Sequence, residues 1–263
     1  MRNILLTIAY DGTNYCGWQI QPNGMTIEEK LQMAFRRMDG STVKVIGSGR
    51  TDARVHAEGQ RANVKLTSTV PTNRIPYALN ANLPSDIVVK AAMEVPMDFH
   101  ARYSALGKTY RYRLYIGKFR DPIERNHHYH ISEPLDISKL KEALELFKGT
   151  HDFKGFMAAG SSVKTTVRTI EKIEVQSEDL NTLDIYISAN GFLYNMVRII
   201  IGTVVDVGKG KITIKQVEEA LKNQNRSSAG HTAPPQGLFL EEVRYKLNDC
   251  KNKETLDTSG ELY

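Results

Sequence analysis

Apolar side chains that recur at every second residue limit the fold of this chain more than any other feature. Stretches of this kind lie at residues 4–10, 62–66, 110–116, 167–176 and 183–188. Residues two apart on an extended backbone point to the same side, so each stretch predicts a strand with one buried face. A short polar turn joins the last two stretches, which predicts a hairpin.

Segments between these strands carry apolar residues at helical spacing behind a capping residue. Thr26, Asp136 and Thr213 stand at the expected N-cap positions, and residues 190–205 are apolar nearly all round, as in a buried helix. No glycine fingerprint of a nucleotide-binding fold connects a strand to a helix. The sequence therefore predicts an α+β fold with two ferredoxin-like (RRM-like) halves. They are expected to form one extended antiparallel sheet with helices on one face and a cleft between the halves.

The order of these segments divides the chain of 263 residues into two expected domains. An N-terminal ferredoxin-like domain is expected at 1–105 and a C-terminal domain at 106–247, and the chain is long enough for a substantial core. Residues 248–263 are polar and lack any period, which predicts a flexible tail.

Composition excludes several classes of protein. The 35 Lys and Arg residues against 30 Asp and Glu give a net charge of +5, a modest excess that suits an anionic partner. Cys16 and Cys250 are far apart in the sequence, so neither a disulfide framework nor a cysteine zinc site is expected. No long apolar segment suggests a signal peptide or a membrane span, so we expect a cytoplasmic protein with no membrane partner.

The polar loop Gly47–Ala57 holds the candidate catalytic group. Within it, Asp52 stands between Arg50 and Arg54, two residues from each, so an extended backbone would place the three side chains on one face. A nearby guanidinium holds a carboxylate ionised even when it is partly desolvated, as a nucleophile or base requires. The alternative is a loop salt bridge with no chemical role. The glycines before Arg50 lack the Lys-Ser/Thr ending of a phosphate-binding loop.

Arg198 is the one charged residue in the apolar stretch 190–205. A buried guanidinium needs an anionic partner, and the candidates are Asp52 and a substrate phosphate. The alternative is that Arg198 lies at the helix edge and extends to water.

Two further segments have open interpretations. Tyr110 and Tyr112 share one face of the strand 110–116, while Arg111 shares the other face with a second arginine. This pattern fits nucleic-acid binding by stacking and phosphate contact, or an amphipathic strand with a solvated basic face. The histidines within 127–130 suggest a metal site, but no carboxylate or cysteine stands at ligand spacing, so no metal is expected.

The segment Gly49–Ala57, with sequence GRTDARVHA, resembles the signature of the tRNA pseudouridine synthase A family. The departure is Arg54, where the family usually carries glycine. If the backbone needs a positive φ there, an arginine is strained. Further motifs that resemble the family occur between residues 4 and 245, including the segment Gln236–Tyr245.

This resemblance implies a catalytic set and a substrate-binding set of residues in the cleft. The essential aspartate is expected beside an arginine clamp, and a second arginine fills the space that a flipped nucleotide leaves. A tyrosine stacks on the base and assists the final proton removal, and a leucine lines the uracil pocket. The catalytic set is Asp52, Arg50 and Arg198, and the substrate-binding set is Tyr110, Leu238, Lys108 and Arg111.

The implied reaction is the isomerisation of uridine to pseudouridine at positions 38, 39 and 40 of the anticodon stem-loop of tRNA, by a homodimer without metal or cofactor. Asp52 would attack C1′ or act through a glycal-type route, and the sequence leaves both open. One alternative is a non-catalytic RNA-binding protein that retains the synthase fold. Another is a nucleoside hydrolase, a reaction that usually needs a second positioned carboxylate.

Overall fold

The computed structural model describes residues 1–160, 163–177 and 179–247, so the predicted tail at 248–263 and Cys250 lie outside the described residues. These residues form one ten-stranded sheet. Its strands are β1 (Arg2–Tyr10), β2 (Ile46–Gly47), β3 (His56–Leu66), β4 (Ile87–Val95), β5 (Ala105–Ile116), β6 (Tyr129–Ile131), β7 (Gly149–Asp152), β8 (Val167–Ser177), β9 (Thr182–Ala189) and β10 (Leu238–Tyr245). The order across the sheet is β4-β1-β3-β10-β5-β9-β8-β7, with β2 paired to β3 and β6 paired to β5.

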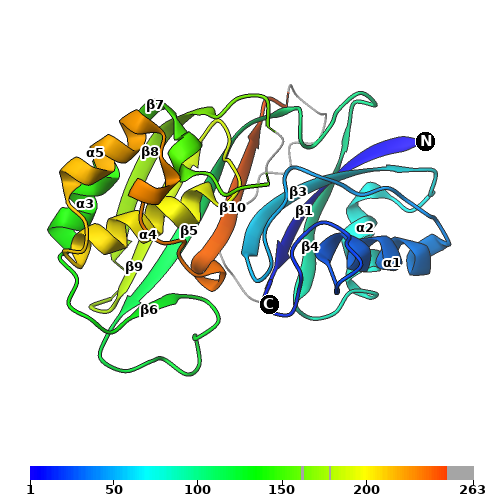
Figure 1. Ribbon diagram of the computed structural model, residues 1–263. Helices are drawn as coiled ribbons and strands as arrows, with labels where there is room; N and C mark the ends of the chain where they lie inside the picture. Colours follow the sequence, from blue (N-terminus) through cyan, green and yellow to red (C-terminus); the bar gives the residue numbers. More distant parts are fainter. Residues whose placement is uncertain (161–162, 178, 248–263) are drawn as a thin grey trace.

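The α-helices lie in two groups beside this sheet. They are α1 (Ile27–Asp39), α2 (Ile75–Asn80), α3 (Ile137–Glu145), α4 (Met196–Gly208) and α5 (Ile214–Asn223). Figure 1 shows α3, α4 and α5 together over the strands of the C-terminal half, and α1 with α2 beside the N-terminal strands. Short 3₁₀ turns occupy Thr72–Arg74, Phe153–Phe156, Arg226–Ser228 and Pro235–Gly237.

The expected N-caps are present. The side chains of Thr26, Asp136 and Thr213 each accept a backbone N–H three residues ahead, at the first turns of α1, α3 and α5. Such a bond satisfies one of the N–H groups that a helix start leaves without a partner. No helix in the described part of the chain is long and apolar enough to cross a membrane.

Register shows that the two halves share one buried face of the sheet. Tyr10 lies opposite Ala57, Ala57 opposite Leu240, and Leu240 opposite Tyr110. Cross-strand partners point to the same side of a sheet, so these side chains line one continuous face. Buried residues of both α1 and α4 belong to the same contiguous core as this face. The helical layers of both halves therefore cover the same side.

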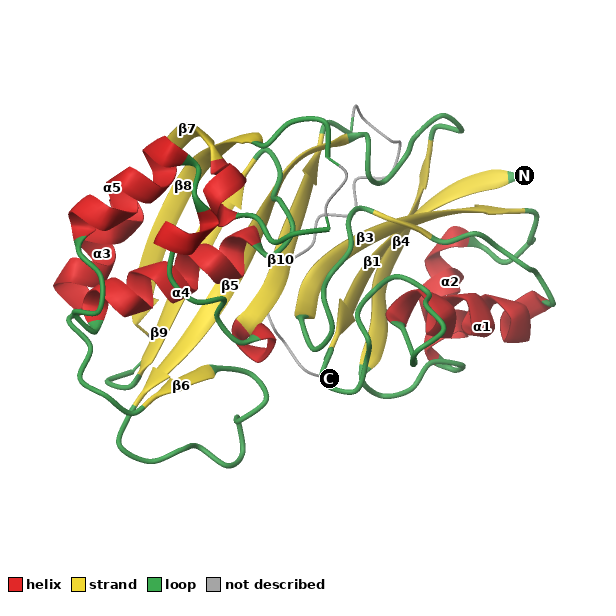
Figure 2. Cartoon of the chain, in the orientation of Figure 1, coloured by secondary structure: helices red, strands yellow, loops and turns green. Residues whose placement is uncertain are grey.

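The strand β10 joins the halves. It pairs in parallel with β3 through Phe239 and Leu240, and antiparallel with β5 along its length. Apart from this pair and β5–β6, the pairings in the described sheet are antiparallel. Figure 2 shows β10 near the middle of the yellow sheet. The predicted α+β class and the large, mostly antiparallel sheet are confirmed.

The apolar stretch 190–205 is helical only in its second part. Asn195 has φ +59°, in the left-handed region, and α4 begins at the next residue, Met196. The prediction of a helix from residue 190 is wrong because apolar character marks burial and does not separate a buried loop from a buried helix.

Candidate active site

The loop that carries Asp52 connects β2 to β3 and is fixed against the loop that follows β1. The hydroxyls of Thr51 and Tyr10 are hydrogen bonded at 2.7 Å, and the Thr51 carbonyl accepts the Trp18 N–H at 3.1 Å. Gly17 has φ +90°, and a Cβ there would lie 2.5 Å from the Thr51 carbonyl oxygen. Glycine alone fits both this φ and this contact, so the backbone before Asp52 is held in one position.

Arg198 extends from the first turn of α4 to Asp52. Its Nη1 lies 3.3 Å from Asp52 Oδ2, and the same atom donates to Asn195 Oδ1 at 2.8 Å. Its Nε donates to the Ala233 carbonyl at 2.8 Å. Only 15% of the side chain is exposed, so Arg198 does not extend to water. The expected contact between Arg198 and Asp52 is confirmed, and the protein fixes the guanidinium before any substrate binds.

Burial governs the protonation of Asp52. It raises the pKa of the Asp52 carboxyl above its ordinary value, and the charge and hydrogen bond of Arg198 offset this rise only in part. The guanidinium alone therefore does not set the pKa, contrary to the interpretation from spacing. A carboxylate that is poorly solvated is a stronger base and nucleophile than one in water, which suits a reacting group.

The two arginines that flank Asp52 in sequence do not contact its carboxylate within the described residues. Arg50 is exposed, and its Nε donates to Gln19 Oε1 at 3.3 Å. Arg54 is exposed and has φ +65°. The Val55 N–H donates to the Asp52 carbonyl at 3.2 Å, so the backbone turns here and the alternation of an extended strand does not apply. The prediction of one face shared by Arg50, Asp52 and Arg54 is therefore wrong.

Tyr110 lies near Asp52 on the covered face of the sheet. It is 9% exposed and meets the ring of Phe192 edge-on, with centroids 5.0 Å apart. Burial raises the pKa of the Tyr110 hydroxyl well above its ordinary value, and the nearby Tyr10 and Asp52 raise it further. The hydroxyl makes no hydrogen bond within the part of the chain that the structure describes. Leu238 lies opposite Tyr112 in the register, so it lines the same face as Tyr110.

Lys108 supports the start of the Asp52 loop. Its Nζ donates to the Ser48 carbonyl at 3.0 Å, and it lies so close to Gly49 that a Cβ there would require Nζ to move. Burial, with the charge of Arg102 as a smaller cause, lowers the pKa of the Lys108 amine to about 8. The structure therefore brings Lys108 next to the residues that precede Arg50.

Arg111 points to the other face of the sheet. Its Nε donates to Glu241 Oε1 at 2.6 Å, its Nη1 lies 3.6 Å from Asp184, and its guanidinium lies 4.2 Å from the centroid of the Phe239 ring. Its charge is thus matched within the chain, on the side away from Tyr110. The solvated basic face considered for this strand is absent at Arg111, and the substrate contact of this residue stays a prediction.

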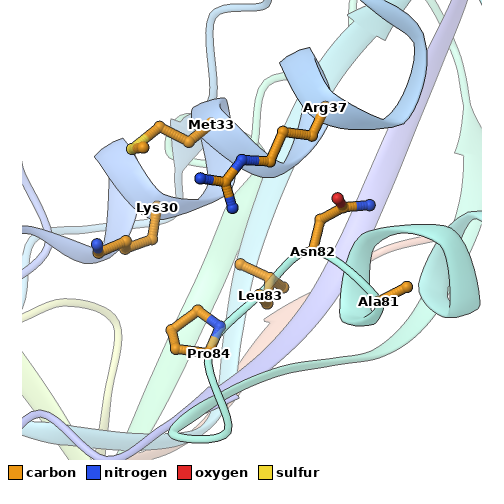
Figure 3. Close-up of a pocket in the computed structure, with 7 residues that line it drawn as sticks. All are labelled: Lys30, Met33, Arg37, Ala81, Asn82, Leu83 and Pro84. Carbon is orange, nitrogen blue, oxygen red and sulfur yellow. The ribbon is translucent and has the colours of Figure 1, made fainter.

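The sequence did not identify Asn195 and Ala233, which hold the Arg198 guanidinium. Asn195 has a visible signal, because it is a polar residue beside the apolar run, whereas Ala233 contributes only a backbone carbonyl. A separate surface cavity of about 340 Å³ lies between α1 and the loop after α2, lined by Lys30, Met33 and Arg37 among others (Figure 3). It shares no residue with the candidate site.

Comparison with known proteins identifies relatives of this chain. A family model described as tRNA pseudouridine synthase matches residues 6–104 and 143–246. A protein of Thermoanaerobacter sp. (strain X514) named tRNA pseudouridine synthase A is 49% identical over 245 residues, covering 93% of this chain and 100% of its own. A protein of the same name from Acetivibrio thermocellus is 48% identical over the same shares of both chains. In Clostridium perfringens, the protein named tRNA pseudouridine synthase A 2 is 47% identical, again over 93% and 100%.

One solved structure, of an archaeal box H/ACA sRNP Nop10-Cbf5 complex, aligns with 85% of this chain and 59% of its own. Its TM-score is 0.36 and its sequence identity 11%. This likeness is too low to bear on the fold or the site.

Proposed function

Because the chain belongs to the tRNA pseudouridine synthase family, we propose that it isomerises uridine at positions 38, 39 and 40 of the anticodon stem-loop of tRNAs, with Asp52 as the nucleophile. The observation that carries this proposal is the contact between Asp52 and Arg198 beside Tyr110. These residues come from different parts of the chain. RNA binding alone would not require a partly buried carboxylate, which repels phosphates.

The reaction rearranges bonds without gain or loss of atoms. The bond between C1′ and N1 of uridine breaks, the uracil turns, and a bond forms between C5 and C1′. N1 gains a proton and C5 loses one. In one route the Asp52 carboxylate attacks C1′ as the bond to N1 breaks, and this ester bond breaks when C5 bonds to C1′. In the other route Asp52 stabilises the positive sugar, removes a sugar proton to give a glycal, and returns that proton when the bond between C5 and C1′ forms. Arg198 holds the carboxylate in place and partly offsets the rise in its pKa, which favours the ionised form that the reaction requires.

The other predicted residues surround the base in this proposal. Tyr110 stacks on the uracil, and Leu238 lines the pocket beside it. The raised pKa of Tyr110 keeps it a phenol near neutral pH, which favours stacking and hydrogen-bond donation over removal of the C5 proton. Arg50, exposed next to Asp52, enters the space that the flipped nucleotide leaves. Lys108 attracts the RNA backbone from beneath the loop.

We also propose that each half is a ferredoxin-like domain, at 1–105 and 106–247, with the catalytic cleft between them. The strand orders β4-β1-β3-β2 and β10-β5-β9-β8 support this, because both fit the β-α-β-β-α-β arrangement. The family resemblance further supports a homodimer that acts in the cytoplasm, where its tRNA substrate is found. Light scattering of the purified protein measures its molar mass and so tests for the homodimer.

The experiment that tests the function maps pseudouridine nucleotide by nucleotide in unmodified tRNA transcripts after incubation with the purified protein. We expect conversion at positions 38 to 40 with the wild type and none with Asp52→Asn. The matched control is Asp98→Asn, the same chemical change at an exposed position away from the site. Because the fold raises the pKa of Asp52, its ionised form destabilises the folded state, so Asp52→Asn is expected to unfold at an equal or higher temperature.

The other outcomes separate the alternatives. Binding of tRNA with no altered uridine overturns the enzyme assignment and leaves a non-catalytic RNA-binding protein. Release of free uracil indicates a hydrolase. Conversion by the Asp52→Asn variant at the wild-type rate removes Asp52 from the reaction.

A further inference from the structure

Two histidines and a carboxylate lie together on the sheet face opposite to Tyr110. Asp11 follows β1, His56 begins β3, and His127 comes from the loop between β5 and β6. One ligand atom of each lies within 4.8 Å of the others. Spacing along the chain indicated no carboxylate ligand for His127. The fold supplies it from Asp11, 116 residues away along the chain.

The outward nitrogen of each ring faces an acceptor. His56 Nε2 lies 2.9 Å from the Asn126 carbonyl oxygen, and His127 Nδ1 lies 3.3 Å from a carboxylate oxygen of Glu124. The Asn126 carbonyl accepts from His56 Nε2, which leaves the lone pair of this ring on the inward Nδ1, as at histidine metal ligands. The inward nitrogens, His56 Nδ1 and His127 Nε2, lie 3.1 and 3.3 Å from the two oxygens of Asp11.

The oxygens of Asp11 thus lie beside the lone pair of His56 Nδ1, and neighbouring donor groups satisfy these acceptors only in part. The Gly12 N–H donates to His56 Nδ1 at 3.1 Å, and Thr13 donates to Asp11 Oδ1 through its N–H and its hydroxyl. His127 Nδ1 is buried and makes no hydrogen bond among the described residues. A buried ring nitrogen normally has a partner, and the hydrogen bond that holds this ring is the long one between Nε2 and Asp11 Oδ2, at 3.3 Å.

The surroundings favour a cation over an anion. The cluster lines a cavity of about 240 Å³ whose wall includes Glu58 and Asp86 and no lysine or arginine of the described chain. Lys90 pairs with Glu58 at 2.8 Å, and the Tyr15 hydroxyl donates to Asp86 at 2.6 Å. The partners of Asp11 are Thr13 and the two imidazoles, and it pairs with no lysine or arginine among the described residues.

We infer that Asp11, His56 and His127 bind one first-row divalent metal ion, for which Zn²⁺ is the best match. Two imidazole nitrogens and one carboxylate oxygen suit this ion, which accepts three protein ligands and keeps a position open. Neighbouring ligands about 2.0–2.1 Å from a tetrahedral zinc lie roughly 3.3 Å apart. The two distances from Asp11 to the histidines are close to this value, and the three ligand atoms would have to draw together from within 4.8 Å of one another. The ion would replace the Gly12 hydrogen bond at His56 Nδ1.

A metal ion there would stabilise the fold, with a water molecule as its fourth ligand. A metal ion there ties the loop 117–128 of the C-terminal half to the start of β3, which follows the Asp52 loop directly. Gly12 already packs against the Val55 carbonyl, so the cluster and the Asp52 loop are in close contact. The ion lies on the far face of the sheet from Tyr110 and takes no part in the reaction.

The test measures metal binding, so it is independent of pseudouridine formation. Chelator-treated protein is titrated with Zn²⁺ by calorimetry and with Co²⁺ by visible absorption. We expect one ion per wild-type chain, and loss of binding in Asp11→Asn and His127→Ala, both of which alter partly exposed side chains. Glu124→Gln, which changes the partner of His127, is expected to weaken affinity about 10- to 100-fold. The matched control is His231→Ala, because His231 pairs with Asp206 at 2.8 Å and belongs to no cluster of three possible ligands in the described part of the chain.

X-ray absorption of the wild-type zinc complex identifies the ligands of the metal without the use of any variant. Two imidazoles and a carboxylate are expected around the metal, whereas a sulfur ligand would place the ion at a cysteine and overturn the assignment. The assignment also fails if the wild type takes up no stoichiometric Zn²⁺, or if Asp11→Asn and His127→Ala bind it as the wild type does.

Discussion

Replacement of Arg54 by glycine is expected to stabilise the protein. Arg54 has φ +65°, a conformation that costs an L-residue roughly 1–2 kcal/mol. Its side chain is exposed and makes no hydrogen bond or ion pair among the described residues, while its N–H donates to the Tyr15 carbonyl and is retained in glycine. Glycine also increases the conformational entropy of the unfolded chain, which lowers the stability by about 0.4–1 kcal/mol. The net gain in the free energy of unfolding is about 0.5–1 kcal/mol, or roughly 1–4 °C in Tm.

Urea denaturation and thermal unfolding measure this gain, and three variants isolate its cause. Arg54→Ala removes the side chain but keeps the strain, so its stability should stay within about 0.5 kcal/mol of the wild type. Ala53→Gly, at a neighbouring exposed position without a positive φ, should lose about 0.4–1 kcal/mol. Gln224→Gly, at φ +54°, should gain like Arg54→Gly. If Arg54→Gly is no more stable than Arg54→Ala, backbone strain at this position is refuted.

Three further predictions concern the site. Arg198→Lys keeps the charge but loses the planar fork, so it should reduce activity without unfolding the protein. Because Arg198 lowers the pKa of Asp52, the acid limb of kcat/KM should also move to higher pH. An unchanged pH–rate profile would mean that Arg198 does not act on Asp52. Tyr110→Phe keeps the ring and should retain far more activity than Tyr110→Ala. If the two variants lose the same activity in single-turnover assays, the hydroxyl is required, and its role as the acceptor of the C5 proton is supported instead. The fold lowers the pKa of Lys108 from 10.5 to about 8, so the buried cation destabilises the folded state below pH 8. The free energy of unfolding of Lys108→Met, relative to that of the wild type, should therefore be highest near pH 7 and fall above pH 8. A difference that does not change with pH contradicts this prediction.

Features encoded by neighbouring residues were predictable from the sequence. The caps at Thr26, Asp136 and Thr213 and the hairpin of β8 and β9 depend on local chemistry, and the structure has them where spacing places them. The partner of Arg198 was also predictable, because burial of a guanidinium restricts it to few anions.

Features that depend on distant residues were not predictable. Arg111 meets Glu241 from 130 residues away, which no strand period reveals. The turn at Asp52 follows from contacts with the loop after β1, so spacing alone wrongly placed Arg50 and Arg54 beside the carboxylate. Asp11 reaches His127 only because the loop 117–128 returns to β3 in the folded chain.

The place of β10 in the sheet has a consequence for how the protein is made. It is the last described strand along the chain, yet it lies between β3 and β5. While a ribosome has not yet synthesised residues 238–245, the edge of β3 at His56 and Ala57 lacks this partner, and pairings between such distant segments form slowly. We expect that Asp52 and Arg198 meet only after this strand is inserted, so a nascent chain stalled before residue 238 cannot modify tRNA.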